Sequence, residues 1–431
     1  MSPEAIGLIA LAALLILIYS GMRVGYVMMF IGFFGLWWLS GFSGAVSVVR
    51  LIPFRTIASY TFAAVGGFML AGIIISDAGF GKDMFDSAYR WLGNTRGGLS
   101  MATSTASAIL GFITYSTVAN ITMGKIAIPE MKKYGYEDGM SAASVCGGAS
   151  LASIVPPSTG FILYSMLTSV SLGKLYMGAM VPALVLYILV LIGIFVKVTL
   201  RPETAPSSGK KFNFADKVKS LKLIWPIVLV IALSLVGIYT GTITPTEASA
   251  VSAMTCIILA LVTRRMTFKA LVEVIKNQAQ MLGMVATLLT GAFVFQRLIT
   301  LSRLPMALSS LIMGMNANRY VVIFVIILAY VVFGMLSDIN AAILITLPII
   351  FPIVEGLGFD SVWFGVVVVS LIELGAISPP LGLNVFTLAG ISGIPAPKIF
   401  KAAVPYMICI VTLIILLVAF PQIATWLPST M

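Results

Sequence analysis

The chain has 431 residues, of which 60% are hydrophobic and 10% charged, and its formal net charge is +11. Too little charged surface remains for a water-soluble protein of this length, so the composition predicts an all-α polytopic membrane protein. The sequence has no histidine, which excludes imidazole metal sites and histidine-dependent catalysis, and it has no glycine-rich phosphate loop. We therefore expect neither enzyme activity nor a cofactor.

Apolar runs of about 20 residues, the length that crosses a bilayer, set the expected helices. They lie at 4–20, 24–48, 57–76, 98–128, 140–170, 177–199, 223–243, 246–263, 280–302, 305–318, 321–354, 362–391 and 402–420. The first run lacks a preceding basic segment and a following small-residue cleavage site, so we expect it to be retained. Single cysteines inside these runs, Cys146, Cys256 and Cys409, are expected to be packing residues.

Basic residues concentrate in two connections. Segment 197–222 carries seven Lys or Arg against two acidic residues, and 264–276 carries four against one, together 11 − 3 = +8. The positive-inside rule places both connections in the cytoplasm and both termini in the periplasm, and it accounts for the basic charge without a nucleic-acid partner. We expect the polar linker 201–222 to join two halves, 1–200 and 223–431.

The two halves share a weak repeat at an offset of 223 positions. The matching residues are Gly111 with Gly334, Thr114 with Ser337, Pro129 with Pro352, Gly135 with Gly358, Pro156 and Pro157 with Pro379 and Pro380, and Pro182 with Pro405. Each copy predicts a re-entrant hairpin and a broken helix, near 98–130 and 140–170 and again near 321–354 and 362–391. Basic residues flank the base of the first hairpin (Arg90, Arg96, Lys132, Lys133) but acidic ones follow the second (Glu355, Asp360), which predicts inverted repeats.

The two Pro-Pro pairs have a chemical consequence. A proline in a helix leaves the carbonyl four residues earlier without its donor, so these pairs free the carbonyls of Ala152, Ser153, Gly375 and Ala376. Free carbonyls at mid-membrane are ligands for a hard cation, and half-helix N-termini opposite them favour an anion. Packing kinks without a ligand are the alternative.

Two carboxylates stand within the second repeat. A carboxylate at the bilayer centre costs about 2.5 to 3.5 kcal/mol, so Asp338 needs a cation nearby, either sodium or Arg297. Glu373 is either an outer acceptor of a cation site or a residue of a polar seam between helices.

These segments resemble a known family. GGASLASIVPPSTGFILYSMLTSVSLGKLYMGAMVP (147–182), GTITPTEASAVSA (241–253), SDINAAILITLPIIFPIVEGLGFDSVWFG (337–365) and LGAISPPLGLNVF (374–386) are similar to the large membrane subunit of tripartite ATP-independent periplasmic (TRAP) transporters. The resemblance covers nearly the whole chain. It implies a sodium-coupled elevator permease in the bacterial inner membrane, a separate small membrane subunit of about four helices (the Q-type subunit), and a periplasmic binding protein that delivers an organic anion.

The resemblance also implies site residues. The first sodium site would comprise Thr114, Ser116, Thr117 and Asn120 with Ala152, Ser153 and Ile154. The second would comprise Gly334, Ser337, Asp338 and Asn340 with Gly375 and Ala376. The anion would contact Ser116, Pro156, Pro157, Ser158, Asn340, Pro379 and Pro380. The chain departs from the family pattern at the first tip, where Tyr115 replaces a glycine and Asn120 an aspartate.

As an elevator, residues 101–170 and 321–391 would move together, while helices within 1–48 and 223–263 would stay fixed as a scaffold. A sodium-anion symporter that needs no binding protein is the first alternative, followed by an intramembrane enzyme and a passive channel. Sialic acids, dicarboxylates, sulfonates and sugar acids all suit a hairpin dipole, so the sequence does not select the anion.

Overall fold

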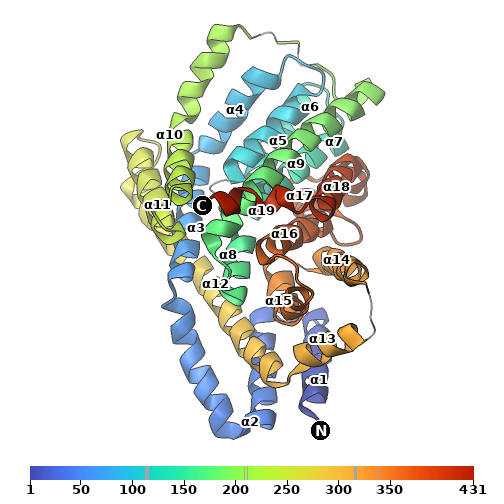
Figure 1. Cartoon of the computed structure of the whole chain (residues 1–431). Helices are drawn as coiled ribbons and strands as arrows, with labels where there is room; N and C mark the ends of the chain where they lie inside the picture. Colours follow the sequence, from blue (N-terminus) through green and yellow to red (C-terminus); the bar gives the residue numbers. More distant parts are fainter. Residues whose placement is uncertain (112–115, 208, 211, 315–317, 338) are drawn as a thin grey trace.

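The computed structural model describes residues 1–431 apart from 112–115, 208, 211, 315–317 and 338, and the side chains of 116–118 and 313. All regular elements in this described part are helices (Figure 1). The first half contains α1 (Pro3–Tyr19), α2 (Val24–Ile57), α3 (Tyr60–Asp77), α4 (Phe80–Leu92), α5 (Gly98–Gly111), α6 (Ser116–Lys133), α7 (Asp138–Ile154), α8 (Thr159–Thr168) and α9 (Leu172–Leu200). The second half contains α10 (Phe214–Tyr239), α11 (Pro245–Val262), α12 (Phe268–Leu301), α13 (Leu304–Gly314), α14 (Arg319–Leu336), α15 (Ile339–Gly356), α16 (Ser361–Ile377), α17 (Leu383–Ser392), α18 (Ala396–Ala419) and α19 (Gln422–Thr425).

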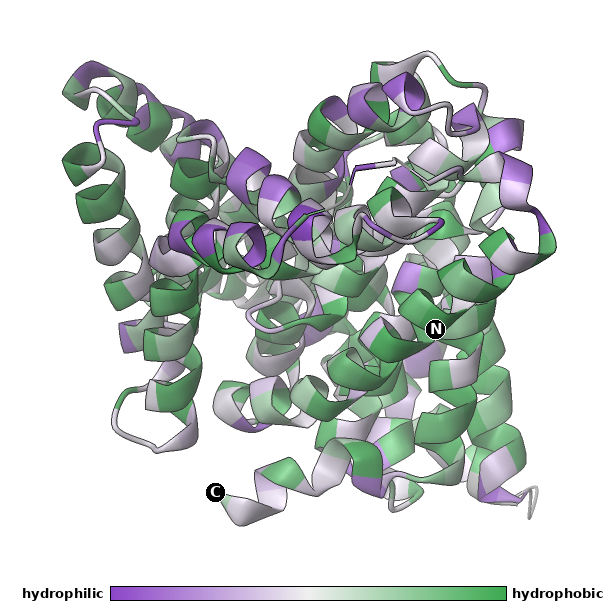
Figure 2. Cartoon of the chain, turned by 90° about the horizontal axis from the view of Figure 1, so that it is seen from above, coloured by the Kyte–Doolittle hydropathy of each residue, from purple (hydrophilic) through white to green (hydrophobic). Residues whose placement is uncertain are grey.

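The helices are suited to a bilayer. Ten segments among the described residues are long and apolar enough to span a membrane, and hydrophobic residues cover most of the helical surface (Figure 2). Large apolar side chains face outward, including Trp38 at 72% exposure and Phe54 at 74%. Such outward apolar surface is stable in lipid and costly in water, so the expected all-α membrane fold is confirmed.

Three boundaries differ from those expected. Helix α2 continues to Ile57 past a kink at Gly41, whose φ of 78° favours glycine. The short helix α4 was not expected, because its charged residues interrupt the apolar pattern. Helix α10 begins at Phe214, inside the stretch 201–222 that was expected to be a linker. Hydropathy indicates where a helix enters the apolar layer, whereas the helix itself can begin earlier in water.

The repeat is present as helices in the same order. Helices α15 and α16 begin 339 − 116 = 223 and 361 − 138 = 223 residues after α6 and α7, and they also end 223 residues later, at 356 and 377 against 133 and 154. In the same way α17 follows α8, and α18 follows α9. Five helices of each half therefore correspond, and they include the hairpin and the broken helix.

Equivalent turns lie at opposite ends of this bundle. At one end, Gly139 at the start of α7 lies against the backbone of Lys398 at the start of α18. At the other end, Gly178 of α9 lies against Val362 of α16. The α6–α7 turn thus neighbours the α17–α18 turn, while its own equivalent, the α15–α16 turn, neighbours the start of α9. The repeats are therefore inverted, as expected.

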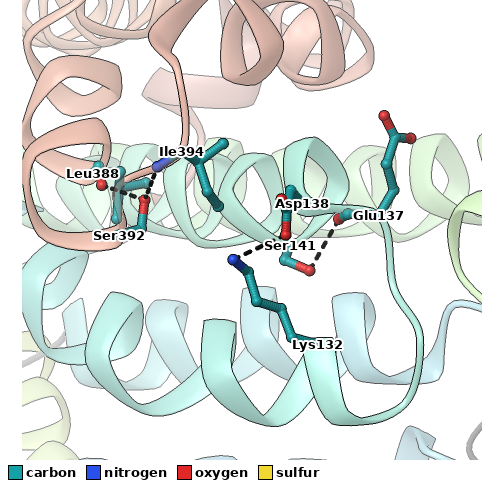
Figure 3. Close-up of polar contacts among 7 residues, drawn as sticks. All are labelled: Lys132, Glu137, Asp138, Ser141, Leu388, Ser392 and Ile394. Carbon is teal, nitrogen blue, oxygen red and sulfur yellow. Dashed lines mark hydrogen bonds and ion pairs between the residues drawn. The ribbon is translucent and has the colours of Figure 1, made fainter.

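Figure 3 shows the end that carries the α6–α7 and α17–α18 turns. Lys132 and Asp138 form an ion pair of 2.9 Å across the first turn, and Ser392 accepts a hydrogen bond from the Ile394 N–H in the second. The ion pair is exposed and contributes at most about 1 kcal/mol. Backbone N–H groups of Glu137 and Gly97 donate to carbonyls of residues 204 and 205, so the basic linker begins at this same end.

This arrangement gives a topology prediction. A cysteine in place of Ser207, which is exposed in the linker, should react with a membrane-impermeant maleimide only after cells are opened. A cysteine in place of Thr242, in the exposed turn between α10 and α11, should react in intact cells, because the 26-residue α10 separates the two positions. The test needs a background without Cys146, Cys256 and Cys409. Labelling of position 207 in intact cells would reverse the orientation.

Candidate functional site

Each hairpin touches its broken helix through glycine. A Cβ on Gly334, near the end of α14, would lie 2.8 Å from the Ile372 Cα and 3.3 Å from the Gly375 Cα of α16. At the equivalent place in the first repeat, a Cβ on Gly111 would collide with Ala152 of α7. Only glycine allows two backbones to approach this closely. The hairpin arm and the broken helix are therefore held backbone to backbone, in the same register in both repeats.

Both broken helices end at their Pro-Pro pairs. Helix α7 ends at Ile154 and α8 begins at Thr159, while α16 ends at Ile377 and α17 begins at Leu383. The peptide bonds Pro156-Pro157 and Pro379-Pro380 are cis. The predicted interruption of each helix at its proline pair is thus confirmed.

One detail of the predicted break is wrong. The Gly375 carbonyl, which we expected to be free, accepts a hydrogen bond from the Ser378 N–H at 3.0 Å. The chain tightens into a turn after Gly375, so a donor three residues on replaces the one that Pro379 lacks. A carbonyl oxygen has two lone pairs, and Gly375 therefore keeps one acceptor position for a ligand.

A buried polar cluster connects the two repeats. Glu373 of α16 is 2% exposed, and its carboxylate accepts a hydrogen bond of 3.4 Å from the Asn384 Nδ2 of α17. The Asn384 carbonyl in turn accepts a bond of 2.9 Å from the Asn120 Nδ2 of α6. On the other side, Ser150 and Ser153 of α7 face the Glu373 carboxyl. The cluster therefore joins the second broken helix to the first hairpin and to the first broken helix.

The cluster lies near the axis that relates the repeats. Glu373 is the equivalent of Ser150, since 373 − 150 = 223, and the two residues face each other across α7 and α16. Equivalent residues can meet only near the symmetry axis. The contacts between α6 and α17 and between α8 and α15 are likewise exchanged by this relation. The two half-sites are consequently neighbours.

The predicted ligands fall into three groups. Thr114 and Asp338 lie outside the described residues, and Ser116 and Thr117 begin α6, with nothing described of their side chains. Buried at or near the breaks are Asn120, Ala152, Ser153, Ile154, Pro156, Pro157, Ser158, Gly334, Gly375 and Ala376. Less buried are Ser337, Asn340, Pro379 and Pro380, of which the last two are exposed.

Two of these side chains have informative geometry. The Asn120 Oδ1 atom is buried without a hydrogen-bond partner among the described residues, and buried polar atoms in this state call for a ligand or water. The Ser337 Oγ donates to the Phe333 carbonyl at 2.9 Å, so its lone pairs remain available to a cation. Arg297, the alternative counter-ion for Asp338, lies on α12 and lines a different cavity with Arg55.

Asn384 and Ser150 were missed as site residues. Asn384 lies in the quoted segment LGLNVF, where it is the one amide side chain among apolar residues. That isolation was the available signal, since a polar side chain within a membrane helix faces the protein interior. Ser150 carried no such signal, because serines recur throughout α7.

Known proteins resemble this chain over almost its entire length. Residues 11–423 match the family described as "Tripartite ATP-independent periplasmic transporter, DctM component". A C4-dicarboxylate TRAP transporter large permease from Pseudomonas aeruginosa is 28% identical, covering 90% of this chain and 93% of that protein. A 2,3-diketo-L-gulonate TRAP transporter large permease from Escherichia coli is 26% identical, covering 96% and 97%. The YdaH transporter of Alcanivorax borkumensis has a similar fold, with a TM-score of 0.60 at 13% identity and 88% coverage of both chains.

Proposed function

Because this chain belongs to the DctM family of TRAP transporters, a multi-pass bacterial inner-membrane protein and large permease for organic acids, we propose that it imports a small organic anion with the sodium gradient. The relatives named for a C4-dicarboxylate and for 2,3-diketo-L-gulonate support an organic acid as the class of substrate. The half-sites do not select among sialic acids, dicarboxylates, sulfonates and sugar acids.

The main support is the pair of inverted half-sites. In each, a glycine at the hairpin contacts a broken helix, at Gly111 with Ala152 and at Gly334 with Gly375. Half-helix N-termini and backbone carbonyls at such breaks bind anions and coupling cations respectively. We propose one sodium site beside each contact, with the anion between them. Two Na⁺ with one monovalent anion carry one net charge, which gains about 2.3 kcal/mol per 100 mV of membrane potential.

The helix packing supports an elevator movement. Helix α12 packs along α2 and α11 along α3, whereas α5 packs on α7 and α14 on α16. We propose the first set as the scaffold and the second set as the moving unit. Figure 1 shows α2 and α12 extending away from the bundle that contains α14 to α18. A rigid unit with two inverted hairpins can present the same site to each side of the membrane in turn.

The partners follow from the same proposal. A small membrane subunit of about four helices, of the Q type, would dock on the scaffold, where α2 presents aromatic residues outward. Phe30 and Phe34, both exposed, have ring centroids 4.6 Å apart, and Trp37 stacks on Phe34. A periplasmic binding protein would deliver the anion to the face opposite the basic linker.

Reconstitution tests this function. The chain and its small subunit are placed in lipid vesicles with an inward sodium gradient, and the binding protein is loaded with an acid found by thermal-shift screening. We expect uptake only when all three components and sodium are present. Uptake without the binding protein would favour a symporter that needs none, and uptake without sodium would contradict sodium coupling.

Asp338 provides a sharper test of the second sodium site. We expect Asp338→Asn to lose most sodium-driven uptake while the protein still inserts and purifies normally, because the carboxylate is balanced by a bound sodium ion. Initial rates at several sodium concentrations measure the effect in vesicles. A mutant with the wild-type rate and sodium dependence would remove Asp338 from the site.

A further inference from the structure

A polar cavity lies away from the hairpins. It has a volume of about 770 Å³ and is enclosed by α2, α3, α11 and α12 together with the turn between α8 and α9. Its size is within the range of about 300 to 1,000 Å³ that small-molecule sites occupy. The cavity therefore bridges the proposed scaffold and the proposed moving unit.

The charge in this cavity has one sign. Arg55 of α2 and Arg297 of α12 both line it, and none of the described lining residues is acidic. The ion pairs between described residues involve Lys132, Lys133 and Arg265 but neither of these arginines. Most other polar groups in the wall are serine and threonine hydroxyls, which can donate to an anion. Two unpaired guanidinium groups with hydroxyl donors form a surface complementary to an oxyanion.

The cavity opens on the face opposite the basic linker. Ser171 and Leu172 in its wall begin α9, and the 29 residues of that helix lead to Arg201 at the start of the linker. At 1.5 Å per residue α9 is about 43 Å long, which crosses a bilayer. Basic residues on the cytoplasmic face serve orientation, but this explanation does not apply to Arg55 and Arg297 on the other face.

The cavity is also tied to the moving unit. Gln296, in its wall on α12, donates a hydrogen bond of 3.1 Å from Nε2 to the Leu167 carbonyl of α8. The Ser165 Oγ donates to the Val170 carbonyl at 2.6 Å and so fixes the α8–α9 turn. A movement of α8 along α12 would therefore change the shape of the cavity.

We propose that this cavity is an anion vestibule, in which Arg55 and Arg297 hold a carboxylate or a similar oxyanion before it reaches the hairpins. The identity of that anion as the transported acid rests on the proposed function, whereas the attraction for oxyanions does not. Focused positive charge in a cleft raises the rate at which anions arrive.

Charge-selective labelling tests the vestibule without knowledge of the substrate. Thr300, which lines the cavity, is replaced by cysteine in the cysteine-free background. The probes are a methanethiosulfonate bearing a sulfonate group and its trimethylammonium counterpart, applied from outside. We expect Arg55→Gln with Arg297→Gln to lower the sulfonate-to-ammonium rate ratio by about tenfold, and Lys at both positions to preserve it. A cysteine at Thr242, outside the lining, is the control, and its ratio should not change.

The same variants are then measured for uptake. If the vestibule serves the transported acid, the glutamine pair should raise KM for that acid several-fold and change kcat little. An unchanged labelling ratio would overturn the vestibule itself, even if wild-type uptake is normal. A changed ratio with an unchanged KM would show that the transported acid bypasses it.

An anionic lipid headgroup is the other source of an oxyanion. Labelling is therefore repeated in vesicles of phosphatidylcholine alone and of phosphatidylcholine with phosphatidylglycerol. A vestibule for the soluble acid should give the same ratio in both lipids. Loss of the sulfonate preference only with phosphatidylglycerol would assign the arginine pair to a headgroup and contradict the proposal.

Discussion

Gly375→Ala is expected to reduce sodium-driven uptake to less than about a tenth of the wild-type rate. The added Cβ would lie 2.5 Å from both the Gly334 Cα and the Met335 N, so the backbones of α14 and α16 would have to separate. Binding sites require their groups within about 0.5 Å of the productive geometry, and overpacking of this kind costs about 1 to 3 kcal/mol. Initial uptake rates in vesicles, with the amount of folded protein measured by gel filtration, give the result.

Two further glycines make this experiment selective. Gly111→Ala should have the same effect, because its Cβ would lie 2.8 Å from the Ala152 carbonyl oxygen at the equivalent contact. Gly390→Ala in α17 should leave uptake near the wild-type rate, because no atom lies within 4 Å of its Cβ. Normal transport by the Gly111 and Gly375 variants would show that the close contacts are not needed for the sites.

Sequence reasoning predicted the fold well where glycine and proline set it. The offset of 223 residues located both hairpins and both breaks, because a Pro-Pro pair cannot continue a helix in any context. Hydropathy was a poorer guide to α4, whose Asp83 pairs with Arg265 of the α11–α12 turn. That ion pair links residues far apart in the chain, and no local pattern indicates it.

The site was predictable as a place but not as a network. The residues at the breaks follow from proline chemistry, whereas the chain of bonds from Glu373 through Asn384 to Asn120 depends on how α6, α16 and α17 cross. The Ser378 N–H replaced the donor that Gly375 was expected to lack, since a tight turn can satisfy a carbonyl locally. Packing of distant helices decides such details, and spacing in one sequence does not contain it.

A disulfide between α3 and α6 is expected to abolish transport until it is reduced. Helix α3 packs with the proposed scaffold, and α6 is the second arm of the first hairpin. The Ser76 Oγ lies 2.8 Å from the Thr122 Oγ1, which places the two Cβ atoms close enough for a disulfide once both residues are cysteine. If the hairpins move past the scaffold during each cycle, this bond holds the protein in one state.

The matched control lies within the scaffold. Ser234 of α10 and Ser252 of α11 are 2.6 Å apart between their Oγ atoms, so Ser234→Cys with Ser252→Cys should form a disulfide as readily. Both helices belong to the part that stays fixed, and uptake should therefore survive oxidation. The measurement compares uptake before oxidation, after complete crosslinking confirmed by mass spectrometry, and after reduction. Full uptake with the Ser76–Thr122 crosslink in place would replace the elevator by a local opening of the hairpins, because α3 and α6 would then keep their contact throughout the cycle.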